Sequence, residues 1–235
     1  MSLLGYIRPH QVLLHIPKTG GTWLGDVIAA NRRWHELPLV RQLSHGNNLA
    51  RVDARFGPHV KVGFVFRDPV ARLHSAFDSR RNFSRPTRDT PWTEAEAACF
   101  NRFASFDAFA RAFAAPEGSE DRDAAEAALN GVGHFKRGLG FFFGDAAQLA
   151  VARPRILFCA ETQNMRHLLP AFARAYGIRP LIEPETARSH SSAAFRTELS
   201  AEGRSIVRAR LAGEYALYDQ CRRIEATLHG ADLAR

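Results

Sequence analysis

Short runs of apolar, β-rich residues alternate along the chain with longer stretches of helical periodicity. Three runs predict strands that are buried on both faces of a sheet: QVLLHI (11–16), VKVGFVF (60–66) and RILFCA (155–160). A weaker strand candidate is PLVRQLS (38–44). Strands that alternate with helices predict right-handed crossovers, and therefore a ligand crevice at the carboxyl ends of the strands.

Apolar residues at i, i+3 and i+4 spacing predict helices between and after these strands. The predicted helices cover residues 22–34, 69–81, 163–176 and about 201–228. We expect Thr162 to be the N-cap of the third helix and Pro170 to kink or interrupt it. The polar stretches 84–93 and 115–123 contain proline or glycine and predict loops.

This pattern predicts an α/β fold: a single domain over residues 1–235, with three layers and a central, mostly parallel sheet flanked by helices. A chain of 235 residues with 46% hydrophobic composition is long enough to bury the core of such a domain. The formal net charge of +8 favours an anionic ligand, whether a nucleotide, an acidic glycan, a nucleic acid or a lipid headgroup. The arginines are spread along the chain, which argues against a nucleic-acid-binding tail.

Cysteine and histidine usage favours neither disulfides nor a metal. Cys99, Cys159 and Cys221 are far apart and form no C-x-x-C pair, and the ten histidines form no H-E-x-x-H pair. The first residues lack the basic start of a signal peptide, and no apolar run approaches the roughly 18 residues of a membrane span. We therefore expect a cytoplasmic protein that binds no metal and has no membrane span.

The segment HIPKTGGTWL (15–24) places a lysine, two threonines and two glycines at a predicted strand-to-helix junction. Such a junction binds anions, because glycines let the backbone approach and the helix N-terminus adds a partial positive charge. In the ATP-binding Walker A pattern the lysine follows the glycines. Here Lys18 precedes Gly20 and Gly21 and would reach the anion from the strand end. The loop is P-loop-like but does not fit an ATPase; an ordinary strand-to-helix turn is the alternative interpretation.

A second candidate element is VFRDPVARLHSAF (65–77). Asp68 and Pro69 are typical of a helix start, with Asp68 as the N-cap, and this leaves no obvious acidic strand end to hold Mg²⁺. Arg67 stands at the carboxyl end of the strand, and Ser75 lies about two turns into the helix, where it can face back toward Arg67. A guanidinium and a hydroxyl that converge suit a second phosphate. Taken singly, each is more often an ordinary surface arginine or helical serine.

Together, HIPKTGGT and RDPVARLHSAF, which follows about 45 residues later, resemble the carbohydrate sulfotransferases that use 3′-phosphoadenosine 5′-phosphosulfate (PAPS). The branch that they resemble includes the heparan sulfate 2-O- and chondroitin sulfotransferases. The resemblance is close over residues 11–83 and weak elsewhere. It implies that Arg67 and Ser75 bind the 3′-phosphate of PAPS. It also implies that the 5′-phosphosulfate is bound by Lys18, Thr19, Gly20, Gly21, Thr22 and Trp23.

Sulfuryl transfer to a hydroxyl needs positive charge at the leaving phosphate and a base for the acceptor. Lys18 and the backbone amides would supply the charge without a metal. His45 is the candidate base, because it follows a short apolar segment near the carboxyl edge of the sheet; a surface loop histidine is the alternative. The 2-O-sulfotransferase pattern is His-Gly-His, whereas Asn47 stands at the second position here. We expect His15 to be a satisfied core histidine and His74 to lie on the surface.

Two further segments have open interpretations. GVGHFKRGLGFFFGD (131–145) could line an acceptor cleft or touch the nucleotide, although a loop leading into a buried aromatic segment is preferred. ARSHSS (187–192) could contact a phosphate or be a polar linker.

Three functions follow from the residues. The first is a PAPS-dependent sulfotransferase acting on a hydroxyl-bearing acceptor, for which the basic charge suggests an anionic saccharide rather than nucleic acid. The second is a non-catalytic protein that binds anionic glycans or nucleic acid, whose affinity should fall steeply with salt. The third is a nucleotide-dependent kinase with an atypical P-loop, which would need Mg²⁺ and prefer ATP.

Overall fold

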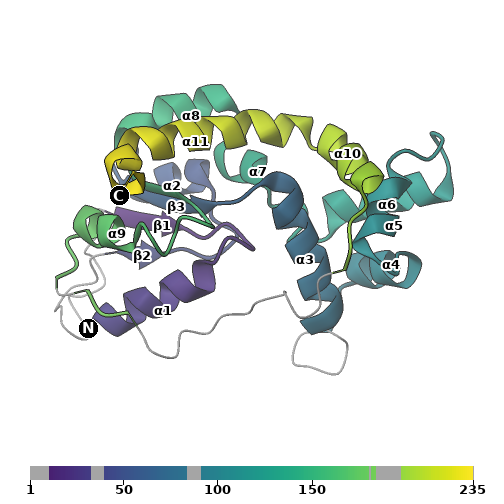
Figure 1. Ribbon diagram of the computed structural model, residues 1–235, viewed down its shortest axis with the longest axis horizontal. Helices are drawn as coiled ribbons and strands as arrows, with labels where there is room; N and C mark the ends of the chain where they lie inside the picture. The colour runs from purple at the N-terminus through teal and green to yellow at the C-terminus, as the bar shows by residue number, and fades with distance from the viewer. Residues whose placement is uncertain (1–10, 33–39, 84–90, 180, 184–196, 235) are drawn as a thin grey trace. The chain divides into compact units, whose positions relative to one another are not determined.

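The computed structural model describes residues 11–32, 40–83, 91–179, 181–183 and 197–234. They divide into two compact units, and Figure 1 labels the elements of both. The first unit contains the described residues within Met1–Arg67, Leu139–Ser189 and Leu217–Arg235. The second contains those within Asp68–Gly138 and His190–Ala216. The single domain expected from the sequence stays a prediction.

The first unit combines a sheet with helices on both of its faces. Its strands are β1 (Gln11–Leu14), β2 (Arg41–Gln42), β3 (Lys61–Phe66) and β4 (Ile156–Glu161). Its helices are α1 (Gly21–Arg32), α2 (Leu49–Phe56), α7 (Leu139–Phe143), α8 (Ala146–Ala152), the 3-10 helix η2 (Arg153–Arg155), α9 (Leu169–Tyr176) and most of α11 (Ala212–Leu233). The predicted α/β fold, with a parallel sheet flanked by helices, is confirmed.

The second unit is helical in its described residues. It contains α3 (Pro69–Phe83), α4 (Glu94–Arg102), α5 (Phe106–Ala112), α6 (Glu120–Gly131), α10 (Ala201–Arg210) and the first residues of α11. Within the described ranges of both units, no helix has the combination of length and apolar character needed to cross a lipid bilayer.

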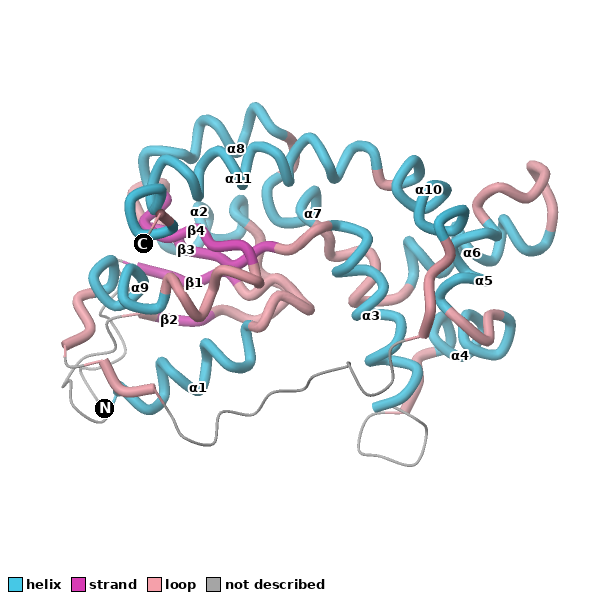
Figure 2. Tube along the Cα trace, viewed as in Figure 1, coloured by secondary structure: helices cyan, strands magenta, loops and turns pink. Residues whose placement is uncertain are grey.

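The four described strands are all parallel and lie in the order β2-β1-β3-β4 (Figure 2). From β1 the chain passes to one side to form β2 and then to the other side to form β3. The strand order therefore reverses beside β1, and the gap between the carboxyl ends of β1 and β3 is the topological switch point at which such sheets bind ligands.

Strand side chains alternate between two apolar layers. Val12, Leu14 and Phe64 pack toward α2, α7, α8 and α11, whereas Leu13 and Val65 pack toward α1 and α9. Figure 1 shows α1 on one side of the sheet and α8 on the other. Because both faces are covered, the strands are apolar at nearly every position, which is the pattern that made them recognisable in the sequence.

The third predicted helix begins later than expected. Residues 163–168 form turns, and α9 begins at Leu169 with Leu168 at its N-cap position. Pro170 therefore lies in the first turn, where a missing N–H removes no helical hydrogen bond, so it does not kink the helix as predicted. The predicted N-cap role of Thr162 is wrong, because its hydroxyl lies 2.9 Å from the carbonyl oxygen of Phe66.

Two other predicted boundaries need correction. The helix expected over about 201–228 is divided into α10 and α11 at Leu211. The loop expected over 115–123 ends early, since α6 begins at Glu120 with Ser119 as its N-cap. Acidic residues in the first turn favour this helix start electrostatically. Of the loop expected over 84–93, residues 84–90 lie outside the described residues.

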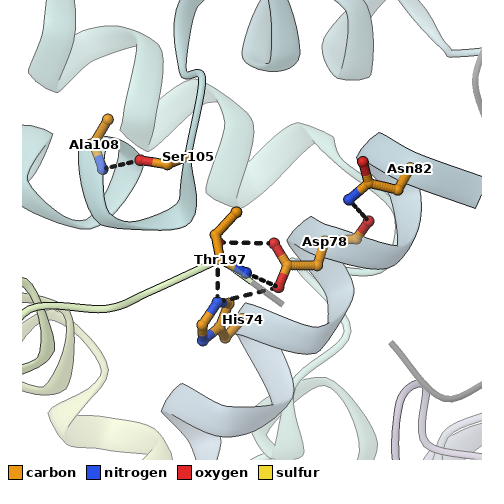
Figure 3. Close-up of polar contacts among 6 residues, drawn as sticks. All are labelled: His74, Asp78, Asn82, Ser105, Ala108 and Thr197. Atoms are coloured by element: carbon orange, nitrogen blue, oxygen red, sulfur yellow. Dashed lines mark hydrogen bonds and ion pairs between the residues drawn. The ribbon is translucent and has the colours of Figure 1, made fainter. Parts of the chain in front are cut away.

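His74 is buried in the second unit, so its predicted surface position is wrong. Its Nε2 lies 3.1 Å from Asp78 Oδ2 and 3.2 Å from Thr197 Oγ1 (Figure 3). Its ring stacks on Phe106. Thr197 donates from its hydroxyl to Asp78 Oδ1 at 3.0 Å and from its backbone N–H to Asp78 Oδ2 at 3.2 Å. These contacts satisfy the hydrogen-bonding needs of the buried Asp78 carboxylate. They also hold the backbone at Thr197 against α3.

Gly63 provides a test of the packing in the first unit. It lies on β3 against the buried Tyr176, whose hydroxyl donates to the carbonyl oxygen of Val12 at 3.2 Å. A Cβ atom at Gly63 would lie 2.1 Å from that hydroxyl oxygen. We expect Gly63→Ala to lower the free energy of unfolding by about 1–3 kcal/mol, measured by urea titration.

The control for Gly63→Ala is Gly230→Ala in α11, where an added Cβ has no atom within 4 Å. There alanine should be neutral or stabilise by up to ~1 kcal/mol, because it is the better helix former. Equal effects of the two substitutions would contradict the packing of Tyr176 against β3.

Candidate anion-binding site

The loop between β1 and α1 has a strained backbone that is held by hydrogen bonds within the loop. Lys18 has a φ of 68° and Gly20 a φ of 83°. Glycine adopts such angles freely, whereas for lysine a positive φ costs on the order of 1–3 kcal/mol. The Thr19 hydroxyl donates to the carbonyl oxygen of Ile16 at 2.9 Å, and the Leu24 N–H donates to that of Gly20 at 3.2 Å. Strain in a non-glycine residue that is held by such contacts is typical of functional loops.

Both loop glycines allow neighbouring side chains to approach closely. A Cβ atom at Gly21 would lie 2.1 Å from a ring carbon of His15, and one at Gly20 would lie 2.7 Å from the terminal carbon of Met165. The sequence explained these glycines by backbone approach to an anion. In the structure, close packing of the loop against His15 and Met165 already requires them.

Two cations meet at the switch point between β1 and β3. Arg67 follows β3 directly, and its Nη1 donates to the carbonyl oxygen of Lys18 at 3.2 Å. Burial lowers the pKa of the Lys18 ammonium, and the positive charge of Arg67 lowers that pKa further. The loop then leads into α1, whose first-turn N–H groups have no acceptor within the helix. Two cations beside a helix N-terminus form an environment that favours an anion.

Thr162 holds the loop from the end of β4. Its hydroxyl lies 2.9 Å from the carbonyl oxygen of Phe66 and 3.3 Å from that of Thr19. Its backbone N–H donates to the same Phe66 carbonyl oxygen at 2.8 Å. Only a capping role was predicted for Thr162, so this link between β3, β4 and the loop was not foreseen. Its position directly after an apolar strand was the available signal.

His45 and His15 are in contact beside the loop, with ring centroids 4.0 Å apart. His45 Nδ1 lies 2.7 Å from the carbonyl oxygen of His15. Because a carbonyl can only accept, Nδ1 carries the proton in the neutral ring, and Nε2 then has the lone pair. Burial lowers the pKa of His15 to about 4, with a smaller contribution from His45, so His15 is neutral at pH 7.

The remaining predicted residues of the loop have different surroundings. The Thr19 hydroxyl already donates a hydrogen bond within the loop, so Thr19 would contact a ligand through its backbone N–H. Thr22 is exposed at the start of α1, whereas Trp23 is 9% exposed and packs into the core. The Arg166 guanidinium lies 5.8 Å from the Trp23 ring centroid, in cation–π geometry, and no motif in the sequence pointed to this residue.

Ser75 lies on α3 in the second unit, where it is buried. Its convergence with Arg67, which belongs to the first unit, stays a prediction. Arg72, on the same helix, donates to the carbonyl oxygens of His134 at 2.8 Å and Phe135 at 3.0 Å. This buried guanidinium therefore holds part of the 131–145 segment.

Of the two segments with open interpretations, one can be described. Phe142 and Phe143 of the 131–145 segment are buried in α7, as the preferred interpretation expected. The 187–192 segment lies outside the described residues. Across the described ranges, no group of three or more His, Cys, Asp or Glu side chains is placed to hold a metal ion.

The backbone of Lys18 can be tested by comparing two substitutions. Lys18→Gly relieves the positive φ and Lys18→Ala does not, so we expect the glycine variant to be more stable than the alanine variant by about 1 kcal/mol in urea unfolding. The same pair at the exposed Lys61 on β3 is the control, because glycine should be the less stable residue in a strand. If the glycine variant were the more stable one at both positions, or the alanine variant at both, the strain at Lys18 would be contradicted.

The lowered pKa of His15 predicts acid sensitivity. The unfolded state, with an ordinary pKa of 6.5, binds the proton between pH 6.5 and 4, whereas the folded state does not. Stability should therefore fall as the pH drops through this window, by up to ~3 kcal/mol from this group. Urea titrations at pH 7, 5.5 and 4.5 should show a smaller fall for His15→Gln than for the wild type. The exposed His59→Gln is the control and should follow the wild type.

Comparison of the chain with protein-family models, with curated proteins and with solved structures gave no match. The geometry of the site is a strained loop at a sheet switch point, with Lys18 and Arg67 together and the contacting rings of His15 and His45 beside them.

Proposed function

We propose that the chain is a PAPS-dependent sulfotransferase that transfers a sulfuryl group to a hydroxyl of a saccharide or other small acceptor. The observation that carries this proposal is the pair of cations at the switch point. Arg67 lowers the pKa of Lys18, which means that each positive charge makes the other less favourable. Bound anionic groups would reverse this effect and stabilise both charges, so the arrangement favours a ligand with more than one anionic group, such as PAPS.

The proposal assigns a set of groups to each charged end of PAPS. Lys18 and the first-turn N–H groups of α1 would bind the 5′-phosphosulfate, and Arg67 with Ser75 would bind the 3′-phosphate. Hydrogen bonds to charged groups contribute roughly 1.5–3 kcal/mol each. Half a dozen of them can exceed the ~8 kcal/mol of a micromolar ligand. The surplus offsets the loss of ligand freedom on binding.

The proposed reaction is a direct displacement at sulfur. The acceptor oxygen forms the new S–O bond while the bond between sulfur and the bridging phosphate oxygen breaks. The leaving 3′-phosphoadenosine 5′-phosphate keeps that electron pair, and Lys18 stabilises the negative charge that develops on it. His45 Nε2 takes the hydroxyl proton, because Nδ1 already donates to the His15 carbonyl. Lys18 and Arg67 supply positive charge, so the proposal includes no metal.

We also propose a cytoplasmic location. Cys99, Cys159 and Cys221 are all free thiols buried in the described structure. Free buried cysteines are usual in reducing compartments, where disulfides do not persist.

Calorimetric binding of 3′-phosphoadenosine 5′-phosphate, ADP and ATP without metal tests the proposal. We expect the 3′-phosphorylated nucleotide to bind most tightly. Arg67→Ala should weaken it about 10- to 100-fold, because a hydrogen-bonded charge contact is lost. The control is Arg222→Ala, which removes an exposed positive charge from α11 and should leave the affinity unchanged.

Arg67 also donates to the Lys18 carbonyl oxygen, so Arg67→Ala could weaken binding by disturbing the loop. A second variant, at a residue that does not contact the loop in this way, distinguishes this effect from the loss of a ligand contact. Ser75→Ala should reduce the preference for the 3′-phosphorylated nucleotide over ADP while leaving ADP binding unchanged. If the wild type binds 3′-phosphoadenosine 5′-phosphate no more tightly than ADP, the sulfotransferase proposal is wrong. A requirement for Mg²⁺ with preference for ATP would favour the kinase instead.

A further inference from the structure

The backbone carbonyl oxygens of the loop between β1 and α1 are hydrogen-bonded to groups around the loop. Those of Lys18, Gly20 and Gly21 accept from Arg67 Nη1 at 3.2 Å, from the Leu24 N–H at 3.2 Å and from Gln42 Nε2 at 2.8 Å. In a trans peptide group the N–H points away from the carbonyl oxygen. Each of these hydrogen bonds therefore also fixes the direction of the N–H group of the following residue.

Gln42 differs from the other two donors because it comes from the neighbouring strand and carries no charge. It lies on β2 opposite Leu13 of β1, and its side chain crosses to Gly21, the first residue of α1. A side-chain amide from β2 therefore holds the first peptide group of the helix. All of these residues belong to the first unit.

Gly25 allows the Gln42 amide to lie against α1. A Cβ atom at Gly25, four residues after Gly21, would lie 2.5 Å from Gln42 Oε1. Glycine is less favourable than alanine inside a helix, so helix formation does not explain its presence at this position. The close approach of the Gln42 amide does explain it.

We propose that Gln42 is a positioning residue for the anion-binding loop. The peptide group that it holds joins Gly21 to Thr22, and the Thr22 N–H is a first-turn donor with no acceptor within the helix. The hydrogen bond from Gln42 fixes the plane of this peptide group. It also polarises the group, which strengthens the Thr22 N–H as a donor to an anion on the opposite side. That this anion is the 5′-phosphosulfate of PAPS rests on the proposed function, whereas the positioning applies to any anion that the loop binds.

The test is calorimetry on the full chain with inorganic pyrophosphate, ADP and 3′-phosphoadenosine 5′-phosphate, without metal. Gln42→Met keeps the length of the side chain but removes the donor. All three affinities should fall by the same factor, about three- to tenfold, as for the loss of one hydrogen bond. The preference for the 3′-phosphate should stay as in the wild type, whereas Ser75→Ala should reduce it.

The matched control is Asn31→Leu, at the other end of α1. Asn31 Nδ2 donates to the carbonyl oxygen of Val27 at 2.8 Å, so this variant also removes an amide-to-carbonyl hydrogen bond from the same helix. All three affinities should remain unchanged in it, because it lies far from the first turn of α1.

Two further measurements separate positioning from a general loss of stability. Gly25→Ala should weaken pyrophosphate binding as Gln42→Met does, because the added Cβ displaces the amide while alanine favours the helix. In NMR spectra, saturating pyrophosphate should move the Thr22 amide proton downfield in the wild type. The movement should be smaller in Gln42→Met, which a merely less stable helix would not produce at saturation.

The outcomes distinguish this proposal from the proposed function. Absence of pyrophosphate binding by the wild type, an unchanged affinity in Gln42→Met, or an equal loss in Asn31→Leu would each overturn the role of Gln42. If the variants behave as expected but 3′-phosphoadenosine 5′-phosphate binds no more tightly than ADP, the role of Gln42 stands and the sulfotransferase proposal falls. If the 3′-phosphate is preferred but Gln42→Met has no effect, the reverse holds.

Discussion

The parallel pairing of β1 with β3 is the constraint on which the candidate site depends. The register runs from Gln11 opposite Lys61 to Leu14 opposite Phe64. Because the two strands are parallel and adjacent, the loop that follows β1 and the arginine that follows β3 emerge at the same point. A slip of one residue would turn the inward side chains of β3 to the opposite face. Since each face packs against its own helical layer, such a slip is strongly disfavoured.

The loop that this pairing positions is held by protein contacts before any ligand arrives. Arg67 holds the Lys18 carbonyl, Thr19 closes the turn onto Ile16, and Thr162 joins it from β4. These contacts offset the backbone strain at Lys18. A loop that is already ordered loses little conformational freedom on binding, so more of its interaction energy with an anion remains as affinity.

The sequence predicted what depends on local pattern. The strands were recognisable because both faces are buried. The loop after β1 was recognisable as a candidate site because lysine, glycines and hydroxyls follow a strand directly. The start of α9 was misjudged because Met165 and Leu168 continue the helical spacing, although they reach the core from a turn. The burial of His74 was missed because Thr197 lies 119 residues beyond Asp78 in the chain.

Net charge is a poor guide to where an anion would bind in this chain. Glu126 raises the pKa of Arg210, because each side of that surface pair stabilises the charge of the other. Arg80 and Arg102 also face carboxylates. Lys18 differs, because burial and a neighbouring cation both lower its pKa. Positive charge that is paired contributes little to ligand binding, whereas charge that is crowded and partly desolvated gains most from an anion. In the proposed function, recognition of the anionic donor would depend on the local crowding of two cations, and the overall excess of arginine would contribute little to it.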